Sequence, residues 1–377
     1  MDNIIFFIII LILILIIVAL SEHYFYYKNY YSMNIQFINT LKNIYVKDFT
    51  EKFNKLIDGD LIDFRSNNIS IIPYDDKYVC VIRFSNHYIS LDKNFIERQK
   101  TIKKIITINK IYLLDKNFNL LKKNIMLDNT NNNLDCEDVR LYTDNTNKKI
   151  YFSGNKYDTI NNNFNVIIGT LDKNLIVDDI IMPKKNFNII KNKDENVPNY
   201  ITKINDILKK HILGDFFKKI TINQHLWEKN WTIFNYKNST HIIYKWYPLH
   251  ICKIIHNKLE LEEIKEMPDN FSFCRGSTNG YEYDGLIWFI IHKVTTYKKY
   301  IHMLVIFDLD MNLKSYIEDF TFEDSYVEFC LGLVVEKERI IISYSTFDTN
   351  CKIAIYDKNH ILDLLFKKLI NNNYNSI

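Results

Sequence analysis

The sequence has almost no net charge and few cysteines, and each of these features argues against certain classes of protein. Lys and Arg number 48 against 45 for Asp and Glu, a formal net charge of +3, so no basic excess indicates a nucleic-acid partner. The six cysteines include no Cys-x-x-Cys pair and no paired histidine spacing. This argues against a zinc site and a dense disulfide framework. We expect most cysteines to be small buried residues on strands.

Apolar residues, in contrast, are plentiful. Hydrophobic residues make up 47% of the sequence and aromatic residues 15%, which supports a sizeable core and excludes global disorder. The length of 377 residues suits two average domains or one large all-β unit.

The N-terminus carries one long apolar run, Ile4–Leu20, followed by four aromatic residues at 24–27. A run of this length is at the short end of what spans a bilayer, and the aromatic residues match an interfacial belt. We therefore expect an uncleaved transmembrane anchor at 1–22. A cleaved signal peptide is the alternative: Ala19 and Ser21 fit a cleavage site, but the basic n-region is missing because Asp2 is the only charged residue before the run. The topology stays open.

Beyond the anchor, the sequence is organised as short strands separated by turn residues. A recurring phrase, a strand followed by Asp and then Asn, occurs at residues 113–117, 170–174, 307–312 and 355–359. Such a hairpin repeated at intervals of roughly one blade predicts an all-β fold, a β-propeller, and about 300 residues in four-stranded sheets correspond to five blades. The alternative is that Asp and Asn simply favour turns. The expected organisation is an anchor at 1–22, a stalk at 23–64, a five-bladed propeller at 65–357 with a helix-containing insertion between blades at 175–225, and a helical tail at 358–377.

Polar residues recur near the ends of strands, with about one cluster for each expected blade. In the motif Glu137-Asp138-Val139-Arg140, two carboxylates and a guanidinium stand at the start of an apolar segment. Such groups tend to line a site, although a surface charge cluster at a turn is the alternative interpretation. The inner strands of a propeller bring equivalent ends of different blades to one axis, so these clusters predict a polar funnel suited to a carbohydrate or a phosphate-bearing substrate. The candidate residues for contacting substrate are Arg83, Glu137, Arg140, Lys229, Trp231, Arg275 and His292.

Two of these candidates have a plainer alternative. A single histidine such as His292 is commonly a satisfied, partly buried side chain, and a tryptophan such as Trp231 is commonly part of the core.

Several short blocks carry a resemblance to a known family. They are Glu-Asp-Val-Arg at 137–140, Glu-Lys-Asn-Trp at 228–231, Tyr-Lys-Trp-Tyr-Pro at 244–248, Arg-Gly-Ser-Thr at 275–278 and Ser-Tyr-Ser-Thr-Phe-Asp at 343–348. In this order, over residues 65–357, the chain resembles the five-bladed propeller β-mannoside phosphorylases and mannosidases. It is also similar to membrane-anchored propeller proteins of giant viruses, and its richness in Ile, Asn, Lys and Tyr is the bias of AT-rich coding.

The resemblance implies roles for four residues. Asp138 would be the general acid that protonates the glycosidic oxygen, while Arg83, Arg140 and Lys229 would contact sugar or phosphate. The chain departs from the family pattern at Val139, where proline is usual, and at 68–71, where Asn-Ile-Ser-Ile replaces Asn-Pro-Ser-Ile. These departures are compatible with drift or with lost activity.

A second catalytic carboxylate is less well defined. Glu228 and Asp348 are the candidates for the base of an inverting hydrolase, whereas a phosphorylase needs no base because phosphate itself attacks. We expect no metal and no cofactor, with inorganic phosphate as a possible co-substrate. The expected partners are a carbohydrate and a membrane. The functional hypotheses are a membrane-anchored enzyme acting on a hexosyl linkage, a catalytically silent propeller that binds sugar or protein, and a structural protein of a virion or host membrane.

Overall fold

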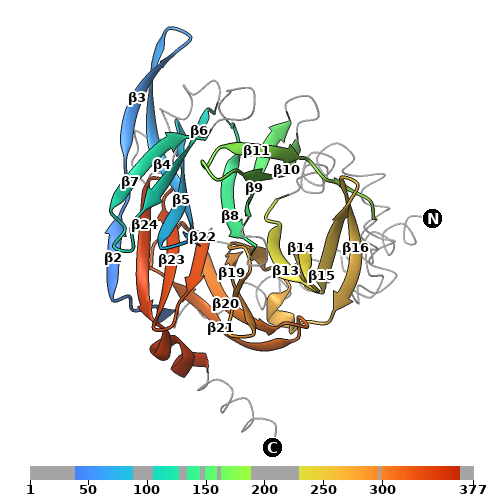
Figure 1. The fold of residues 1–377 in the computed structure, drawn as a ribbon. Helices are drawn as coiled ribbons and strands as arrows, with labels where there is room; N and C mark the ends of the chain where they lie inside the picture. The colour runs from blue at the N-terminus through green and yellow to red at the C-terminus, as the bar shows by residue number, and fades with distance from the viewer. Residues whose placement is uncertain are drawn as a thin grey trace, which may run out of the picture. The chain divides into compact units, whose positions relative to one another are not determined.

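The fold of the chain is known from a computed structural model, which describes residues 39–87, 105–126, 134–144, 149–158, 163–187, 229–295 and 299–365. The expected anchor at 1–22 lies outside these ranges, as do residues 188–225 of the expected helix-containing insertion. Within them, no helix is both long and apolar enough to cross a membrane. The described residues form five β-sheets arranged as the blades of a propeller (Figure 1), so the predicted five-bladed, all-β architecture is confirmed.

The main strands of each blade are antiparallel and follow one another along the chain. Blade 1 contains β3 (Lys52–Ile57), β4 (Asp60–Tyr74), β5 (Lys77–Ser85), β6 (Thr107–Leu114) and β7 (Leu120–Ile125). Blade 2 contains β8 (Glu137–Thr143), β9 (Ile150–Asp158), β10 (Asn163–Leu171) and β11 (Val177–Ile181). Blade 3 contains β13 (Thr232–Tyr236), β14 (Ser239–Trp246), β15 (Leu249–Ile255) and β16 (Lys258–Lys265).

The last two blades complete the ring. Blade 4 contains β17 (Arg275–Gly276), β18 (Tyr281–Tyr283), β19 (Leu286–Val294), β20 (Tyr300–Asp308) and β21 (Leu313–Thr321). Blade 5 contains β22 (Glu328–Val335), β23 (Arg339–Thr346) and β24 (Asn350–Asp357). In blades 2 to 5 the first strand along the chain lies nearest the central axis. In blade 1 the strand nearest the axis is the second one, β4, which forms a hairpin with β3.

The segment expected to be a stalk contributes strands to three blades, so that expectation is wrong for residues 39–64. Strand β1 (Asn39–Thr40) pairs in parallel with β21 of blade 4, and β2 (Tyr45–Asp48) is the outermost strand of blade 5, antiparallel to β24. The first described strands therefore complete sheets whose other strands come from near the end of the chain, and these pairings close the ring of blades. The strand signal was missed because β2 and β3 are largely exposed and lack an apolar run.

The expected insertion at 175–225 likewise begins later than predicted. Residues Val177–Ile181 form the outer strand of blade 2, and β12 (Lys184–Lys185) runs parallel to β16 at the edge of blade 3.

Three of the four Asp-x-Asn phrases form the same hairpin, one each in blades 1, 2 and 4. In each, an aspartate Oδ1 accepts two backbone N–H groups of the turn: Asp115 from Asn117 and Asn119, Asp172 from Asn174 and Ile176, and Asp308 from Asp310 and Asn312. The fourth phrase is different, because Asp357 accepts the N–H of His360 at 2.8 Å at the start of a helix over 358–365. There the aspartate acts as a helix N-cap.

The apolar core consists of five buried clusters, and each lies between two neighbouring blades. Strands buried on both faces, such as β5, β19, β20 and β22, read as nearly continuous apolar runs, which explains their clear signal in the sequence. Five of the six cysteines are buried, and all six are free thiols.

Candidate functional site

The inner strands all begin at the same end of the central axis, which we call the site end. Side chains there interact from blade to blade. Asn68 of β4 and Asp138 of β8 are hydrogen-bonded, and Arg140 of β8 reaches Asn230, just before β13, and Ser277, just after β17. The polar clusters predicted for separate blades are therefore neighbours in space.

A β-bulge in β8 positions Asp138. Pairing with β9 shifts register between Glu137 and Arg140, and Asp138 has a φ of 54° in the left-handed region. A bulge redirects a side chain and is common beside functional sites. Val139, which occupies the position of the family's proline, is buried in the cluster between blades 1 and 2, so this departure concerns a core contact.

Three donors hold the carboxylate of Asp138. Oδ1 accepts from Asn68 Nδ2 at 2.7 Å and from Arg83 at 3.3 Å, and Oδ2 accepts from Asn155 Nδ2 at 3.2 Å. A carboxylate offers about four acceptor positions, so one position on Oδ2 is left for a proton or a ligand.

Glu137 is the centre of an ion-pair chain across three blades. Its Oε1 accepts from Arg83 of blade 1 at 3.0 Å, and its Oε2 accepts from Lys229 at 3.3 Å, ahead of blade 3. Burial raises the pKa of Glu137, but the charges of Arg83 and Lys229 outweigh it and leave that pKa below its ordinary value. Glu137 is therefore ionised at neutral pH. Lys229 Nζ also lies 3.4 Å from the ring centroid of Phe164, a cation–π contact.

Arg140 is buried next to this chain of ion pairs and supports it through hydrogen bonds. It donates to the carbonyl of Ser277 at 2.6 Å, to Asn230 Oδ1 at 3.0 Å and to the carbonyl of Asp138 at 3.1 Å. Burial lowers its pKa to about 10, against the opposing effect of Asp138. The guanidinium thus remains charged at neutral pH and ties blade 2 to blades 3 and 4.

His292 and Arg275 extend the site into blade 4. They are register partners on β19 and β17. The Nδ1 of His292 is 2.7 Å from Ser277 Oγ, and its ring stacks on Tyr300. Burial, assisted by the charges of His302 and Arg275, holds the pKa of His292 well below its ordinary value, so the ring is neutral. Arg275 is exposed.

Asp348 is a second carboxyl at the site end. It follows β23 in the turn before β24, with a left-handed φ of 50°. Among the described residues its carboxyl makes no hydrogen bond or ion pair. Burial raises its pKa to about 7, Arg83 opposes the shift, and the charges of Asp138 and Glu137 add to it. We call Arg83, Glu137, Asp138, Lys229 and Asp348 the axial charge cluster.

The structure thus brings together eight of the ten sequence-predicted site residues at one end of the axis. Trp231 is not among them, because it belongs to the apolar core between blades 2 and 3, where its ring packs against Tyr244. Glu228 lies outside the described residues. The sequence reasoning missed Asn155 and Tyr300 altogether. Asn155 could have been found from the hairpin register, since it lies opposite Glu137. In the described part of the chain, no group of three or more His, Cys, Asp or Glu residues could hold a metal ion.

Comparisons with known proteins agree with the fold. No family model and no curated protein sequence matches the chain. Solved structures do match. A glycosyl hydrolase from Bacteroides ovatus is 13% identical, with a TM-score of 0.51 over 87% of this chain and 93% of that one. A β-1,2-mannobiose phosphorylase from Listeria innocua is 11% identical, with a TM-score of 0.50 over 80% and 91% of the two chains.

A third match comes from the GH130 family of mannoside phosphorylases, which contains glycoside hydrolases that target β-1,2-mannosidic linkages in Candida mannan. It is 12% identical, with a TM-score of 0.50 over 86% of this chain and 97% of that one. At these identities the likeness is one of fold, and the fold is the glycosidase-like five-bladed propeller that the sequence resemblance implied.

Proposed function

We propose that the chain is a glycan-active propeller that cleaves or transfers a hexosyl unit at the site end of its axis, with Asp138 as the general acid. The observation that carries this proposal is that one charge cluster contains two carboxyl groups in different environments. Asp138 is fixed by Asn68, Arg83 and Asn155, whereas Asp348 has no hydrogen-bond or ion-pair partner among the described residues and a pKa of about 7. Carboxyls whose environments differ in this way are the usual basis of acid–base catalysis.

The chemistry follows from these two environments. Asp138 donates a proton to the glycosidic oxygen as the bond from that oxygen to the anomeric carbon breaks. In a hydrolase, ionised Asp348 removes a proton from the attacking water as the water oxygen bonds to the anomeric carbon, and that proton returns through solvent to Asp138. In a phosphorylase, the attacking dihydrogen phosphate bonds to the anomeric carbon and its own proton replaces the one that Asp138 gave to the leaving oxygen. The product is a free sugar when water attacks and a sugar phosphate when phosphate attacks.

The substrate proposed is a β-mannoside, because two of the matching structures are named for β-1,2-mannosidic linkages. Phosphate as the attacking group needs a cation that is not already paired. Arg83 and Lys229 are both bound to Glu137. Arg275 is exposed and has no ion pair among the described residues, so it is the guanidinium we propose to meet phosphate.

The test compares the full-length wild type with Asp138→Asn, Asp348→Asn and, as a matched control, Asp179→Asn on the exposed outer strand β11. Each is incubated with β-1,2-mannobiose and other β-mannosides, with and without phosphate, and mannose and mannose 1-phosphate are separated by chromatography. Loss of a general acid lowers turnover by about 10²–10⁴-fold, so Asp138→Asn should lose activity while Asp179→Asn keeps it. Undiminished turnover in Asp138→Asn would sink the assignment.

A silent binding module is the second candidate, and one observation favours it. Arg83, Lys229, Glu137 and Asp138 already satisfy one another, as they would in a purely structural network that holds three blades together. This alternative predicts that the wild type binds a mannoside without releasing product, and that binding survives Asp138→Asn.

Attachment to a membrane of a virus or its host, through residues 1–22, is part of the proposal and rests on the apolar run Ile4–Leu20. Extraction of membranes with alkaline carbonate should leave the full-length chain in the pellet and release a chain that lacks residues 1–22. Release of both would contradict the anchor.

A further inference from the structure

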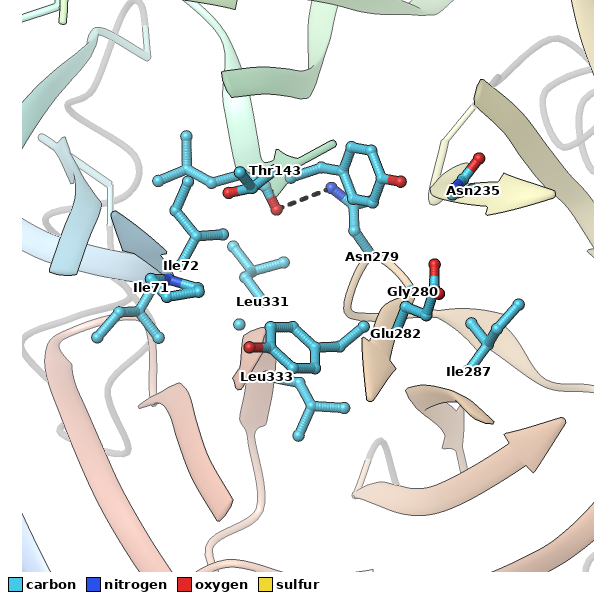
Figure 2. Close-up of a pocket in the computed structure, with 15 residues that line it drawn as sticks. Ile71, Ile72, Thr143, Asn235, Asn279, Gly280, Glu282, Ile287, Leu331 and Leu333 are labelled. Carbon is cyan, nitrogen blue, oxygen red and sulfur yellow. Dashed lines mark hydrogen bonds between the residues drawn. The ribbon is translucent and has the colours of Figure 1, made fainter. Parts of the chain in front are cut away.

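The axis is closed behind the proposed catalytic site, so a long glycan has to extend outward from the site end. Asn279 donates to the carbonyl of Leu141 at 3.1 Å, drawn as a dashed line in Figure 2, and Ser70 donates to the carbonyl of Leu331 at 3.1 Å. These hydrogen bonds link blade 4 to blade 2 and blade 1 to blade 5. The opening beyond them, which Figure 2 shows, encloses about 30 Å³. That is about the volume of one water molecule in the liquid, so a sugar ring does not fit there.

Strand β9 continues outward from the proposed general acid. It runs toward the site end, because it is antiparallel to β8. Its pairing with β10 is regular from Ile150 to Asp158, so side chains alternate between the two faces of the sheet. Asn155 and Tyr157 therefore point to the same face, about 6.6 Å apart along the strand. Since Asn155 donates to Asp138 Oδ2 at 3.2 Å, Tyr157 is the next side chain on this face beyond the proposed acid.

A second set of contacts connects Tyr157 to the axial charge cluster. The ring of Tyr157 lies 5.0 Å from that of Phe164, its register partner on β10, at an interplanar angle of 58°. Lys229 Nζ lies 3.4 Å from the ring centroid of Phe164 and 3.3 Å from Glu137 Oε2. One aromatic ring thus separates Tyr157 from a cation of the cluster. Two routes, through Asn155 and through Lys229, place Tyr157 at the border of the site.

Tyr157 presents an aromatic surface at this border. Its side chain is 44% exposed, whereas its partner Phe164 is partly buried. A tyrosine ring supported in this way offers a flat apolar face with a hydroxyl at its edge. A hexose has C–H groups on a face of its ring and hydroxyl groups around the edge, so it can stack on such a surface. Stabilisation of the hairpin by a cross-strand aromatic pair accounts for the contact between the two rings, but not for their place beside Asn155 and Lys229.

We propose that Tyr157 is a stacking platform for a sugar beyond the two that the cleaved bond joins, and that the substrate is an oligosaccharide of at least three hexose units. This inference rests on the proposed function, because it takes Asp138 as the point of cleavage. The glycan runs from Asp138 past Asn155 to Tyr157, and the ammonium group of Lys229 lies beside this path as a donor to sugar hydroxyls. The two sugars joined by the cleaved bond occupy the space next to Asp138, so the sugar over Tyr157 is at least the third.

The test is calorimetric titration of the full-length chain carrying Asp138→Asn, so that the ligand is bound without being consumed. The ligands are β-1,2-mannobiose, β-1,2-mannotriose and β-1,2-mannotetraose at pH 7. We expect the tetraose to bind at least about fivefold more tightly than the biose, which is the order of one aromatic stacking contact. Adding Tyr157→Ala should remove this gain and leave the affinity for the biose unchanged.

Three further variants identify the ring itself as the cause. Tyr45 is the matched control, because it is also 44% exposed but lies on β2, the outermost strand of blade 5. Adding Tyr45→Ala should keep the gain, and so should Tyr157→Phe, which retains the ring. Tyr157→Ile keeps an apolar side chain suited to a strand against Phe164 but has no flat face, so it should lose the gain. A thermal melt like that of the parent shows that the hairpin is intact.

Turnover of the same three ligands by the wild type, with and without phosphate, separates this inference from the proposed function. The platform is overturned if no ligand binds, if biose and tetraose bind equally well, if Tyr157→Ala keeps the gain, or if Tyr45→Ala loses it as well. A gain that depends on Tyr157 without any turnover would support the platform and contradict the proposed cleavage. Turnover of the biose with no gain for the tetraose would support cleavage and overturn the platform.

Discussion

The carboxamide of Asn68 donates to Asp138 Oδ1 at 2.7 Å while its own oxygen accepts from Ser345 Oγ at 2.7 Å. A single amide thus connects blades 1, 2 and 5 and fixes the orientation of the carboxylate from a position buried to 3% exposure. Because Ser345 occupies the amide oxygen, the amide nitrogen is the end that faces Asp138. Asn68 is therefore a positioning residue for the proposed general acid.

Replacement of Asn68 by Ala should uncouple Asp138 from this support. We expect the free energy of unfolding to fall by about 1–2 kcal/mol for the lost hydrogen bonds. On the proposed mannoside substrate, kcat should fall about tenfold or more with little change in KM, because the carboxylate is held less firmly. Ser345→Ala is the matched control and should have a smaller effect of the same kind. An unchanged kcat in Asn68→Ala would show that the amide serves only the fold.

Asp348 should make the protein less stable as the pH rises. Its ordinary pKa is 3.8 and its folded-state pKa is about 7. Between these values the folded chain keeps a proton that the unfolded chain has released, so the free energy of unfolding decreases with pH over this window. Asp348→Asn removes this loss, and its melting temperature should fall less between pH 5 and pH 8 than that of the wild type. Parallel pH curves for the two proteins would contradict the raised pKa.

Arg140 should be among the costliest polar residues to replace. Arg140→Met leaves the carbonyls of Ser277 and Gly276 and the Asn230 side chain without their donor, and we expect a loss of about 3–5 kcal/mol in urea unfolding. Arg140→Lys keeps the charge, but one ammonium cannot serve acceptors in blades 2, 3 and 4 together, so an intermediate loss is expected. Equal stability of wild type and Arg140→Lys would show that charge alone matters.

The sequence predicted the blades well where buried strands give nearly continuous apolar runs. Strands such as β19 and β20 are buried along nearly their whole length, and the aspartate turns at 115, 172 and 308 have a local cause within five residues. Both the apolar runs and the aspartate turns can be recognised without any knowledge of neighbouring sheets. The strands β1 and β2 could not be predicted, because they exist only through pairing with β21 and β24, almost the whole chain away.

The same distinction between local sequence patterns and contacts made on folding applies to the candidate site. Glu137, Asp138 and Arg140 are adjacent in sequence and stand out as a charge cluster, whereas Asn155 gains its place by facing them across a hairpin. Sequence alone could not separate Trp231 from the site, since a tryptophan two residues after a lysine suits a sugar platform as well as a core. The packing between blades 2 and 3 decides that question.

Gly276 provides a steric test of how closely blades 3 and 4 meet beside the site. A Cβ at this position would lie 2.4 Å from the backbone oxygen of Asn230 and 2.4 Å from Thr232 Cγ2. Because one of these neighbours is backbone, β17 and β13 would have to separate, and we expect Gly276→Ala to lose about 1–3 kcal/mol in urea unfolding. It should also lower turnover of the proposed mannoside substrate, since Arg140 contacts both Gly276 and Asn230.

Two comparisons identify the cause of that loss. Adding Thr232→Ser to Gly276→Ala removes the methyl contact but leaves the backbone one, so it should restore only part of the stability. Gly285→Ala introduces a Cβ that meets nothing within 4 Å, at a φ of +72°, so its loss of about 1 kcal/mol should come from backbone strain alone and leave turnover unchanged. Full rescue by Thr232→Ser would mean that the two blades can accommodate the backbone contact, and that the close approach of Gly276 to Asn230 is not what fixes Arg140 in place.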